Sequence, residues 1–281
     1  RLNLDRKIKN NFKVGTHINA SHTITNAVAT DTGGQGGVVN GAIKMSPVQT
    51  IYENDETKEY TQVNVPGVLI PNPYATAKEQ LFNNGQSRFL GDMYAEWEFV
   101  PNLLFRTSVG TDVVYFKGNR YTPSTIYQAN GLATGNINVN RSINWLNENT
   151  LTWTKLLNNH SFNLLGGFTL QQNNSEGVSA SSSGFVNDML TYNDLGSGSV
   201  YNSPGSSATQ WNLMSYLGRI NYSYKDRYLF SVNARFDGSS RFGENNKYGF
   251  FPSASAGWRI SEESFMESIR SVVTNLKLRA S

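Results

Sequence analysis

Histidines are the first residues in this sequence to weigh for catalysis or metal binding. His17 and His22 are an odd number of positions apart, so on a strand they point to opposite faces and cannot share a metal ion. His160 is expected in a short turn. With no cysteine in the chain, a thiolate zinc site, a cysteine nucleophile and a disulfide scaffold are excluded. The sequence therefore predicts no catalytic constellation, no metal site and no cofactor.

Closely spaced acidic residues are the next candidates for chemistry. Residues 52–59 include Glu53, Asp55, Glu56 and Glu59, for which a solvated loop surface and a calcium site both stay open. Glu96 and Glu98 are two positions apart, so on a strand they project from one face. The glycine-rich run at 33–41 lacks the Gly-Lys-Ser/Thr ending of a phosphate-binding loop and is expected to be a flexible loop.

The composition is poor in charge and rich in neutral polar and aromatic residues. The 281 residues include 24 basic and 21 acidic side chains, and only 16% are charged, against about 25% in an average soluble domain. No basic cluster provides the phosphate-neutralising surface that nucleic acid requires. No run approaches the roughly 18 apolar residues of a transmembrane helix, although transmembrane strands, which alternate in polarity, never show such a run.

Strands are the elements that must position these side chains. Alternation with a period of two predicts strands at 12–24, 89–99, 103–115, 145–153, 162–170, 214–224, 228–237 and 250–261. With partial strands at both ends, this gives about ten strands of roughly ten residues, the length of a tilted bilayer crossing. The chain begins without methionine and stops inside an alternating run, so we expect it to be part of a longer chain.

Each strand has one apolar face and one polar face. Along 214–224 the apolar face carries Met214, Tyr216 and Ile220, while Arg219 lies on the opposite face. The polar faces supply the candidates for a water-filled interior: Glu96, Glu98, Arg219, Arg235, Asp237 and Arg259. Tyr222, Tyr224 and Tyr228 cluster beside a short turn, where the aromatic girdle of a membrane barrel is expected.

The connections alternate between short and long. Short links are expected at 5–11, 100–102, 156–160 and 225–227, and long links at 25–87, 117–136, 173–209 and 238–248, with a short helix at 38–45. In a meander, this pattern places all tight turns at one end and all long loops at the other, as in an outer-membrane barrel. A soluble or surface β-rich protein that binds carbohydrate through exposed aromatics remains an alternative.

Several segments resemble the SusC/RagA class of TonB-linked outer-membrane transporters of Bacteroidetes. They are Tyr-Leu-Gly-Arg-Ile-Asn-Tyr-Ser-Tyr-Lys-Asp-Arg-Tyr-Leu at 216–229, Arg-Phe-Asp-Gly-Ser-Ser-Arg-Phe-Gly at 235–243 and Asn-Lys-Tyr-Gly-Phe-Phe-Pro-Ser-Ala-Ser-Ala-Gly-Trp-Arg-Ile-Ser at 246–261. The resemblance implies an all-β fold, an antiparallel 22-stranded transmembrane barrel closed by a plug. Residues 1–281 would form about half of that barrel, without the plug, the TonB box or the final strands.

The resemblance also implies a function and partners. Such a receptor resides in the outer membrane, surrounded by lipid, and imports glycan or peptide oligomers with energy from TonB. A SusD-like surface lipoprotein captures the substrate outside. The polar-face charges, among them Arg219, Arg235, Asp237 and Arg259, would then bond the barrel wall to the plug. The links 25–87 and 173–209 would meet the lipoprotein or the substrate.

Overall fold

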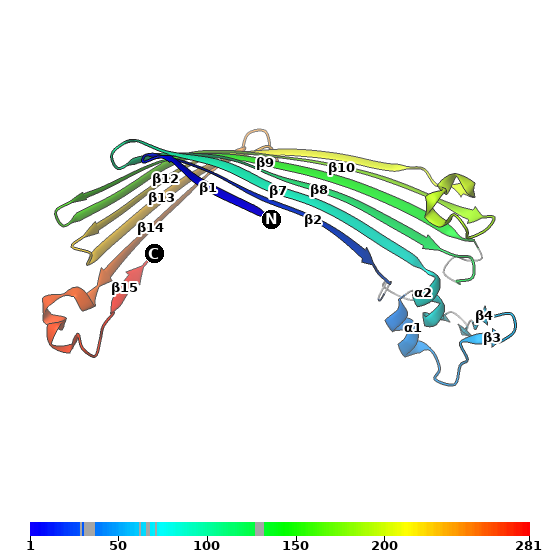
Figure 1. The fold of residues 1–281 in the computed structure, drawn as a ribbon. Helices are drawn as coiled ribbons and strands as arrows, with labels where there is room; N and C mark the ends of the chain where they lie inside the picture. The colour runs from blue at the N-terminus through cyan, green and yellow to red at the C-terminus, as the bar shows by residue number, and fades with distance from the viewer. Residues whose placement is uncertain (29, 31–36, 62, 66–67, 71, 127–131) are drawn as a thin grey trace.

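The computed structural model describes residues 1–28, 30, 37–61, 63–65, 68–70, 72–126 and 132–281. Its main feature is one antiparallel sheet, drawn in Figure 1 as a single arched layer. The strands follow chain order from β1 to β15, with β11 paired to β10 at the side. Most of the glycine-rich run expected to be a loop lies outside the described residues.

The long strands of this sheet have the following bounds. They are β1 (Leu2–Lys9), β2 (Phe12–Asn26), β7 (Leu81–Val100), β8 (Leu103–Thr122), β9 (Thr134–Leu157), β10 (His160–Phe185), β12 (Gly205–Tyr224), β13 (Tyr228–Ser239) and β14 (Tyr248–Arg259). The short strands β11 (Gly198–Tyr201) and β15 (Lys277–Ala280) complete it. The predicted strands are all present, and the register pairs each neighbour antiparallel.

The strands are longer than the sequence pattern predicts. β9 has 24 residues and β10 has 26, where alternation indicated 145–153 and 162–170. The expected loop at 173–209 therefore shrinks, because its first part belongs to β10 and its last part to β12. The residues added to β10 are mostly polar on both faces, for example Gln172 and Asn173, so they carry no clear alternation of polarity. The residues added to β9 do alternate, with Ile137, Val139 and Ile143 on one face, and the prediction missed this signal.

The link between β2 and β7 has structure of its own beyond the end of these strands (Figure 1). It contains α1 (Val38–Lys44), close to the helix expected at 38–45, and α2 (Pro73–Glu79). It also contains two small hairpins, β3 (Tyr52–Asn54) with β4 (Glu59–Tyr60) and β5 (Val63–Val65) with β6 (Val68–Ile70). Further along the chain, η2 (Thr191–Asn193) and η3 (Leu195–Ser197) are short 3₁₀ turns between β10 and β11.

The expected alternation of short and long connections holds from β1 to β14 and then ends. β14 returns to the short-turn end, yet it is followed by residues 260–276 rather than by a tight turn. This link holds the 3₁₀ helices η4 (Ile260–Glu262) and η5 (Ser264–Ile269). In Figure 1 it hangs from the end of the sheet opposite to α1 and α2. The family-like sequence at 246–261 did not predict the structured link at 260–276, because the residues of this link show no periodic pattern of polarity.

The sheet has no second layer, so it has no ordinary core. Large apolar side chains on one face stay exposed, with Met93 65%, Ile220 51% and Phe250 61% accessible. A one-layer soluble sheet would leave this area in water at a cost of about 25 cal/mol per Å². Among the described residues no helix is long and apolar enough to cross a membrane, which does not bear on crossing by strands.

Candidate functional site: the two faces of the barrel wall

The strand register brings the predicted polar-face residues to one face of the sheet. Glu98 on β7 is linked through successive cross-strand pairs on β8, β9 and β10 to Arg219 on β12. The parallel row from Glu96 leads in the same way to Arg235 on β13. Side chains on one such row share a face. Glu96, Glu98, Arg219 and Arg235 therefore belong to one polar face, which also carries Asp237, two positions after Arg235.

On β12 and β13 the predicted charges are bonded to neighbours within the sheet. The Arg235 Nε donates to both Asp237 carboxylate oxygens at 2.6 and 2.9 Å, and another guanidinium nitrogen donates to Ser215 Oγ at 3.0 Å. Ser215 is fully buried beneath this pair. The Arg219 Nε donates to Asn233 Oδ1 at 2.7 Å. These arginines thus already have partners and still expose part of each guanidinium for a further contact.

The two glutamates of β7 differ in role. Glu96 accepts a hydrogen bond from Arg106 on β8 at 2.7 Å, forming a cross-strand ion pair. Glu98 accepts from the backbone N–H of Asn102 at 2.8 Å. Asn102 has a positive φ of 68° in the β7–β8 turn, so this carboxylate holds the tight turn that reverses the chain. The two glutamates, expected from the sequence to project from one face, therefore have separate roles: Glu96 forms an ion pair on the face of the sheet, and Glu98 stabilises the β7–β8 turn.

Arg259 lies at the short-turn end of the polar face, directly opposite Lys277 on β15. Arg279 follows two positions along β15, opposite Gly257. Like charges directly opposite each other on a sheet repel. A hollow of about 560 Å³ extends from Lys277 and Arg279 toward the hydroxyl and amide groups of Ser161, Asn163, Asn221, Ser231 and Ser255. Three cations, Arg259, Lys277 and Arg279, therefore gather at this corner of the polar face.

Tyr94 is the centre of the polar face at the other edge, and the sequence reasoning missed it. Its hydroxyl hydrogen-bonds to the Asp5 carboxylate two strands away. Lys13 and Arg106 lie over its ring, with Nζ and Cζ at 5.2 and 4.5 Å from the ring centroid. The His17 ring stacks beside it at 5.9 Å. Tyr94 is buried although it sits on the polar face.

A glycine makes the reach of Tyr94 possible. Gly15 is paired with both Tyr94 on β7 and Asp5 on β1, and a methyl group there would overlap both the Tyr94 ring and the Asp5 carboxylate. Because Gly15 has no side chain, the ring crosses β2 to reach β1. The signal in the sequence was an aromatic residue at the polar parity of its strand, between Met93 and Ala95, with a glycine on the preceding strand.

The opposite face carries an apolar belt that continues from strand to strand. On β10 and β12 it covers residues 162–170 and 214–224, and register places Phe162 against Tyr222 and Leu170 against Met214. The length matches the roughly 9–11 residues that a tilted strand needs to cross a bilayer. Beyond the belt the same face turns polar, with the ion pair between Arg141 and Glu176 at 3.0 Å. The belt is therefore bounded, as a lipid-facing zone must be.

The girdle candidates lie on the belt face at the short-turn end. Tyr224 and Tyr228 stack across the β12–β13 turn with centroids 6.4 Å apart, and Tyr222 stacks on Phe230 at 6.2 Å. His160, expected in a turn, is instead the first residue of β10. Its Nδ1 lies 2.8 Å from the Tyr222 hydroxyl. This histidine is part of an aromatic cluster on the belt face.

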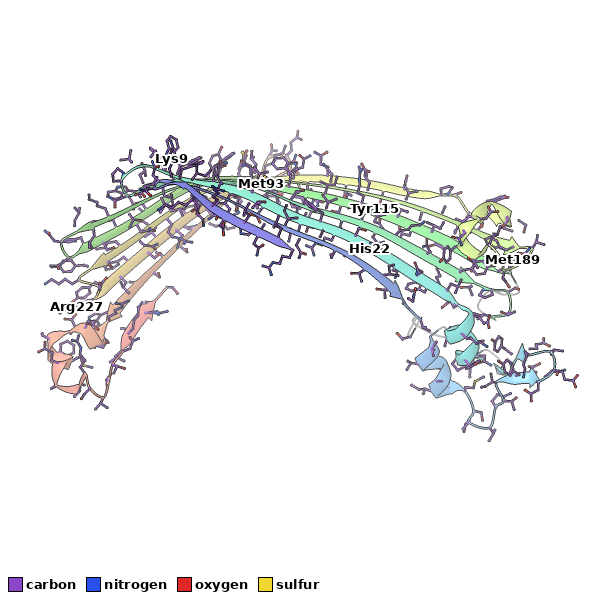
Figure 2. All side chains as sticks on the ribbon, viewed as in Figure 1. Lys9, His22, Met93, Tyr115, Met189 and Arg227 are labelled. Atoms are coloured by element: carbon purple, nitrogen blue, oxygen red, sulfur yellow. The ribbon has the colours of Figure 1, made fainter. Side chains whose placement is uncertain are left out.

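The described residues contain no group of three or more histidine or acidic side chains placed to hold a metal ion. The two strand histidines do face opposite sides, since His17 contacts Asp92 and His22 contacts Ser87. In the mixed-charge loop considered for calcium, Asp55 pairs with Lys58 at 3.7 Å. Figure 2 places His22 and Tyr115 on the half of the strands that leads to Met189, away from Lys9 and Arg227 at the short-turn end.

The unit built by the β2–β7 link is held together by Asn72 and Tyr60. The Asn72 side chain accepts from the first N–H groups of α2 and donates to the carbonyls of Ile51 and Thr61. Tyr60 is buried and donates to Glu79 at 2.7 Å. Burial, helped by the Glu79 carboxylate, raises the pKa of the Tyr60 hydroxyl. The β2–β7 link is thus an ordered unit at the long-loop end of the strands, beyond the apolar belt.

Comparison with known proteins places the chain among outer-membrane receptors. No protein-family model matches it. It is 35% identical over 99% of its length to TonB-dependent receptor P3 of Formosa agariphila, of which it spans 28%. It is 27% identical over 87% of its length to TonB-dependent receptor SusC of Bacteroides thetaiotaomicron, of which it spans 26%.

A solved structure agrees in fold. The RagAB peptide transporter superposes with a TM-score of 0.82 at 19% identity, covering 99% of this chain and 31% of that chain. The chain therefore spans about a third or less of the proteins that it matches. Its bounded apolar belt, its polar face and its antiparallel register fit this fold along their whole extent. The chain belongs to the SusC/RagA-type TonB-dependent receptors and forms part of their outer-membrane β-barrel.

Proposed function

We propose that the polar face lines the lumen of an importer for glycan or peptide oligomers, energised by TonB and assisted by a SusD-like lipoprotein. One observation carries the proposal: a largely apolar belt runs along one face of the long strands, interrupted on β9 by Asn147 and Asn149, while the other face carries bonded charges and neutral polar groups. Lipid on the belt side leaves the polar side for water, the plug and the substrate.

The polar face offers two kinds of surface to what passes or fills the lumen. Near β1 to β8 it is charged, with ion pairs such as Arg88–Asp112 at 2.7 Å and Arg106–Glu96 at 2.7 Å. Around β10 to β14 it carries hydroxyl and amide groups, such as Asn163 and Ser231, beside the charges of Arg219, Arg235 and Asp237. A plug elsewhere in the complete receptor would rest on the half-exposed Arg219 and Arg235. Neutral oligomers rich in hydroxyl or amide groups would match the second surface.

The ordered unit at the loop end is the proposed contact for the lipoprotein or the substrate. It lies beyond the polar end of the belt and is tied to the barrel by β2 and β7. Its tyrosines Tyr52, Tyr60 and Tyr74 form one aromatic group, with centroid separations of 5.2 to 6.4 Å. Tyr74 is the exposed member of this group.

Single-cysteine labelling of the complete receptor in lipid vesicles tests the facing. Cysteines at 230, 232 and 234 should react with a lipid-phase probe, and cysteines at 231, 233 and 235 should react only with a water-soluble one. The two sets alternate on one strand and serve as controls for each other. The reverse pattern would overturn the proposal, as would a complete receptor that stays monodisperse without detergent.

An uptake assay tests the activity. Cells that express the receptor should accumulate labelled oligomers only when TonB and the lipoprotein are both present. Mono- and disaccharides or dipeptides, which pass through porins, should enter regardless. Oligomer uptake that persists without TonB would reject an energised importer. Comparing neutral glycans with peptides of the same length then separates the two substrate classes.

A further inference from the structure

Glu263 holds residues 260–276 against the belt side of the barrel. Its carboxylate accepts from the Tyr228 hydroxyl at 2.7 Å and from the Trp258 indole N–H at 2.9 Å. Arg227, in the β12–β13 turn, donates to it at 3.1 Å. Tyr228 and Trp258 are cross-strand partners on the apolar face. The segment is therefore fixed to the lipid side of the wall rather than to its polar face.

The tether lies at the level where lipid headgroups are expected. Tyrosine and tryptophan favour this level because each has an apolar ring and a polar tip. Here the polar tips of Tyr228 and Trp258 both point to one carboxylate beyond the strand ends. A carboxylate held in this way places the residues that follow it beside the headgroups and not at a distance from the membrane.

The segment itself is ordered, and it exposes apolar side chains. Ser261 is buried, and its carbonyl accepts from Arg270, which also pairs with Glu262 at 2.7 Å. Met266 is buried within it. By contrast, three nearby apolar side chains are exposed: Phe265 63%, Ile269 45% and Val272 84%. An ordered segment that displays such residues marks an interaction surface.

We propose that residues 260–276 rest on the phospholipid leaflet at the short-turn end, with Phe265, Ile269 and Val272 in the acyl boundary and Glu263 as the tether. Phospholipid is the occupant because Glu263 bonds the segment to Tyr228 and Trp258, which belong to the apolar belt. Lys225, exposed in the adjoining turn, supplies a cation for lipid phosphates, whereas Arg227 is already paired with Glu263. The inference rests on the proposed lipid-facing role of the belt.

Spin labelling of the complete receptor in phosphatidylethanolamine–phosphatidylglycerol vesicles tests this surface. Nitroxides would be placed at Phe265→Cys, Val272→Cys and, as the matched control in the same 3₁₀ helix, Glu267→Cys. Collisions with oxygen relative to a water-soluble nickel chelate should be several-fold higher at 265 and 272 than at 267. Equal collision ratios at all three sites would overturn the inference. A surface covered by another protein instead of lipid would give this result.

Two further measurements separate the tether from the barrel. Labels at 230 and 231 report the facing of the wall; if 230 is not exposed to lipid, the proposed function itself fails. If 230 is exposed to lipid and 265 and 272 are not, only this inference fails. Glu263→Gln keeps the size of the side chain but removes its charge, and should reduce lipid exposure at 265 and 272. Unchanged exposure would refute the role of Glu263.

Discussion

Gly15 gives a sharp test of how the polar face is built. In Gly15→Ala the new methyl group would overlap the Tyr94 ring and the Asp5 carboxylate. Asp5 can move aside, whereas the Tyr94 ring is held between Lys13, Arg106 and His17. Forcing a methyl group into such a site costs about 1–3 kcal/mol. Alanine loses less backbone entropy than glycine when the chain folds, and this offsets roughly 0.5–1 kcal/mol of the cost.

Gly218→Ala is the matched control. Gly218 also lies inside a long strand, but a methyl group there would meet nothing within 4 Å. It should leave stability unchanged or raise it by roughly 0.5–1 kcal/mol. The two variants would be compared in the complete receptor by denaturant unfolding in micelles, followed by tryptophan fluorescence. We expect Gly15→Ala to be less stable than Gly218→Ala by about 1–3 kcal/mol.

A double-mutant cycle identifies the cause. If the clash is with Tyr94, Gly15→Ala should cost almost nothing in a Tyr94→Ala background, with a coupling energy of about 1–3 kcal/mol. Two outcomes would refute the reasoning. One is a Gly15→Ala variant as stable as Gly218→Ala. The other is a loss that persists without the ring, which would place the cost in the strand itself.

Three further predictions concern the two ends of the barrel. Asn72→Ala removes the cap of α2 and leaves the Thr61 carbonyl without its side-chain donor, while the Ile51 carbonyl keeps a backbone bond from Thr61, so proteolysis within 45–60 should accelerate as the unit loses about 2–4 kcal/mol; Asn72→Ser, which keeps a cap acceptor, should lose less, and equal rates would contradict this. Because the pKa of Tyr60 is raised in the folded unit, its stabilising contribution is complete below about pH 10 and is lost as the pH rises further; the protection of the unit's amides, measured as exchange relative to the intrinsic rate at the same pH, should fall there, and Tyr60→Phe should show no such fall. Hydrogen bonds from Trp258 and then Tyr228 lower the pKa of Glu263 below 4.5, so the tether is complete above that pH and is lost as the pH falls through the lowered pKa; amide protection within 260–276, measured as exchange relative to the intrinsic rate at the same pH, should fall on acidification, except in Glu263→Gln.

The sequence determined the fold class and the two faces. Alternation along 214–224 and 228–237 follows from the geometry of a strand, and burial in lipid on one side preserves it in the residue types. The predicted strands and the placement of Arg219, Arg235 and Glu96 on one polar face follow from that parity, and the helix expected at 38–45 is present as α1. The place of the girdle candidates Tyr222, Tyr224 and Tyr228 on the belt face, beside a turn, follows from the same parity.

Only the tertiary structure decided which of these residues meet. Periodicity gives the face of a side chain but not its partner, because partners depend on register between strands far apart in sequence. Register brought Asp5, Gly15 and Tyr94 together, and it separated Glu98, which caps a turn, from Glu96, which pairs with Arg106. The extension of β10 beyond the belt and the segment at 260–276 were also hidden from the sequence, whereas the extension of β9 alternates in polarity and was simply missed. The β10 extension is mostly polar on both faces and residues 260–276 are not periodic, so only backbone pairing and the contacts of Glu263 define them.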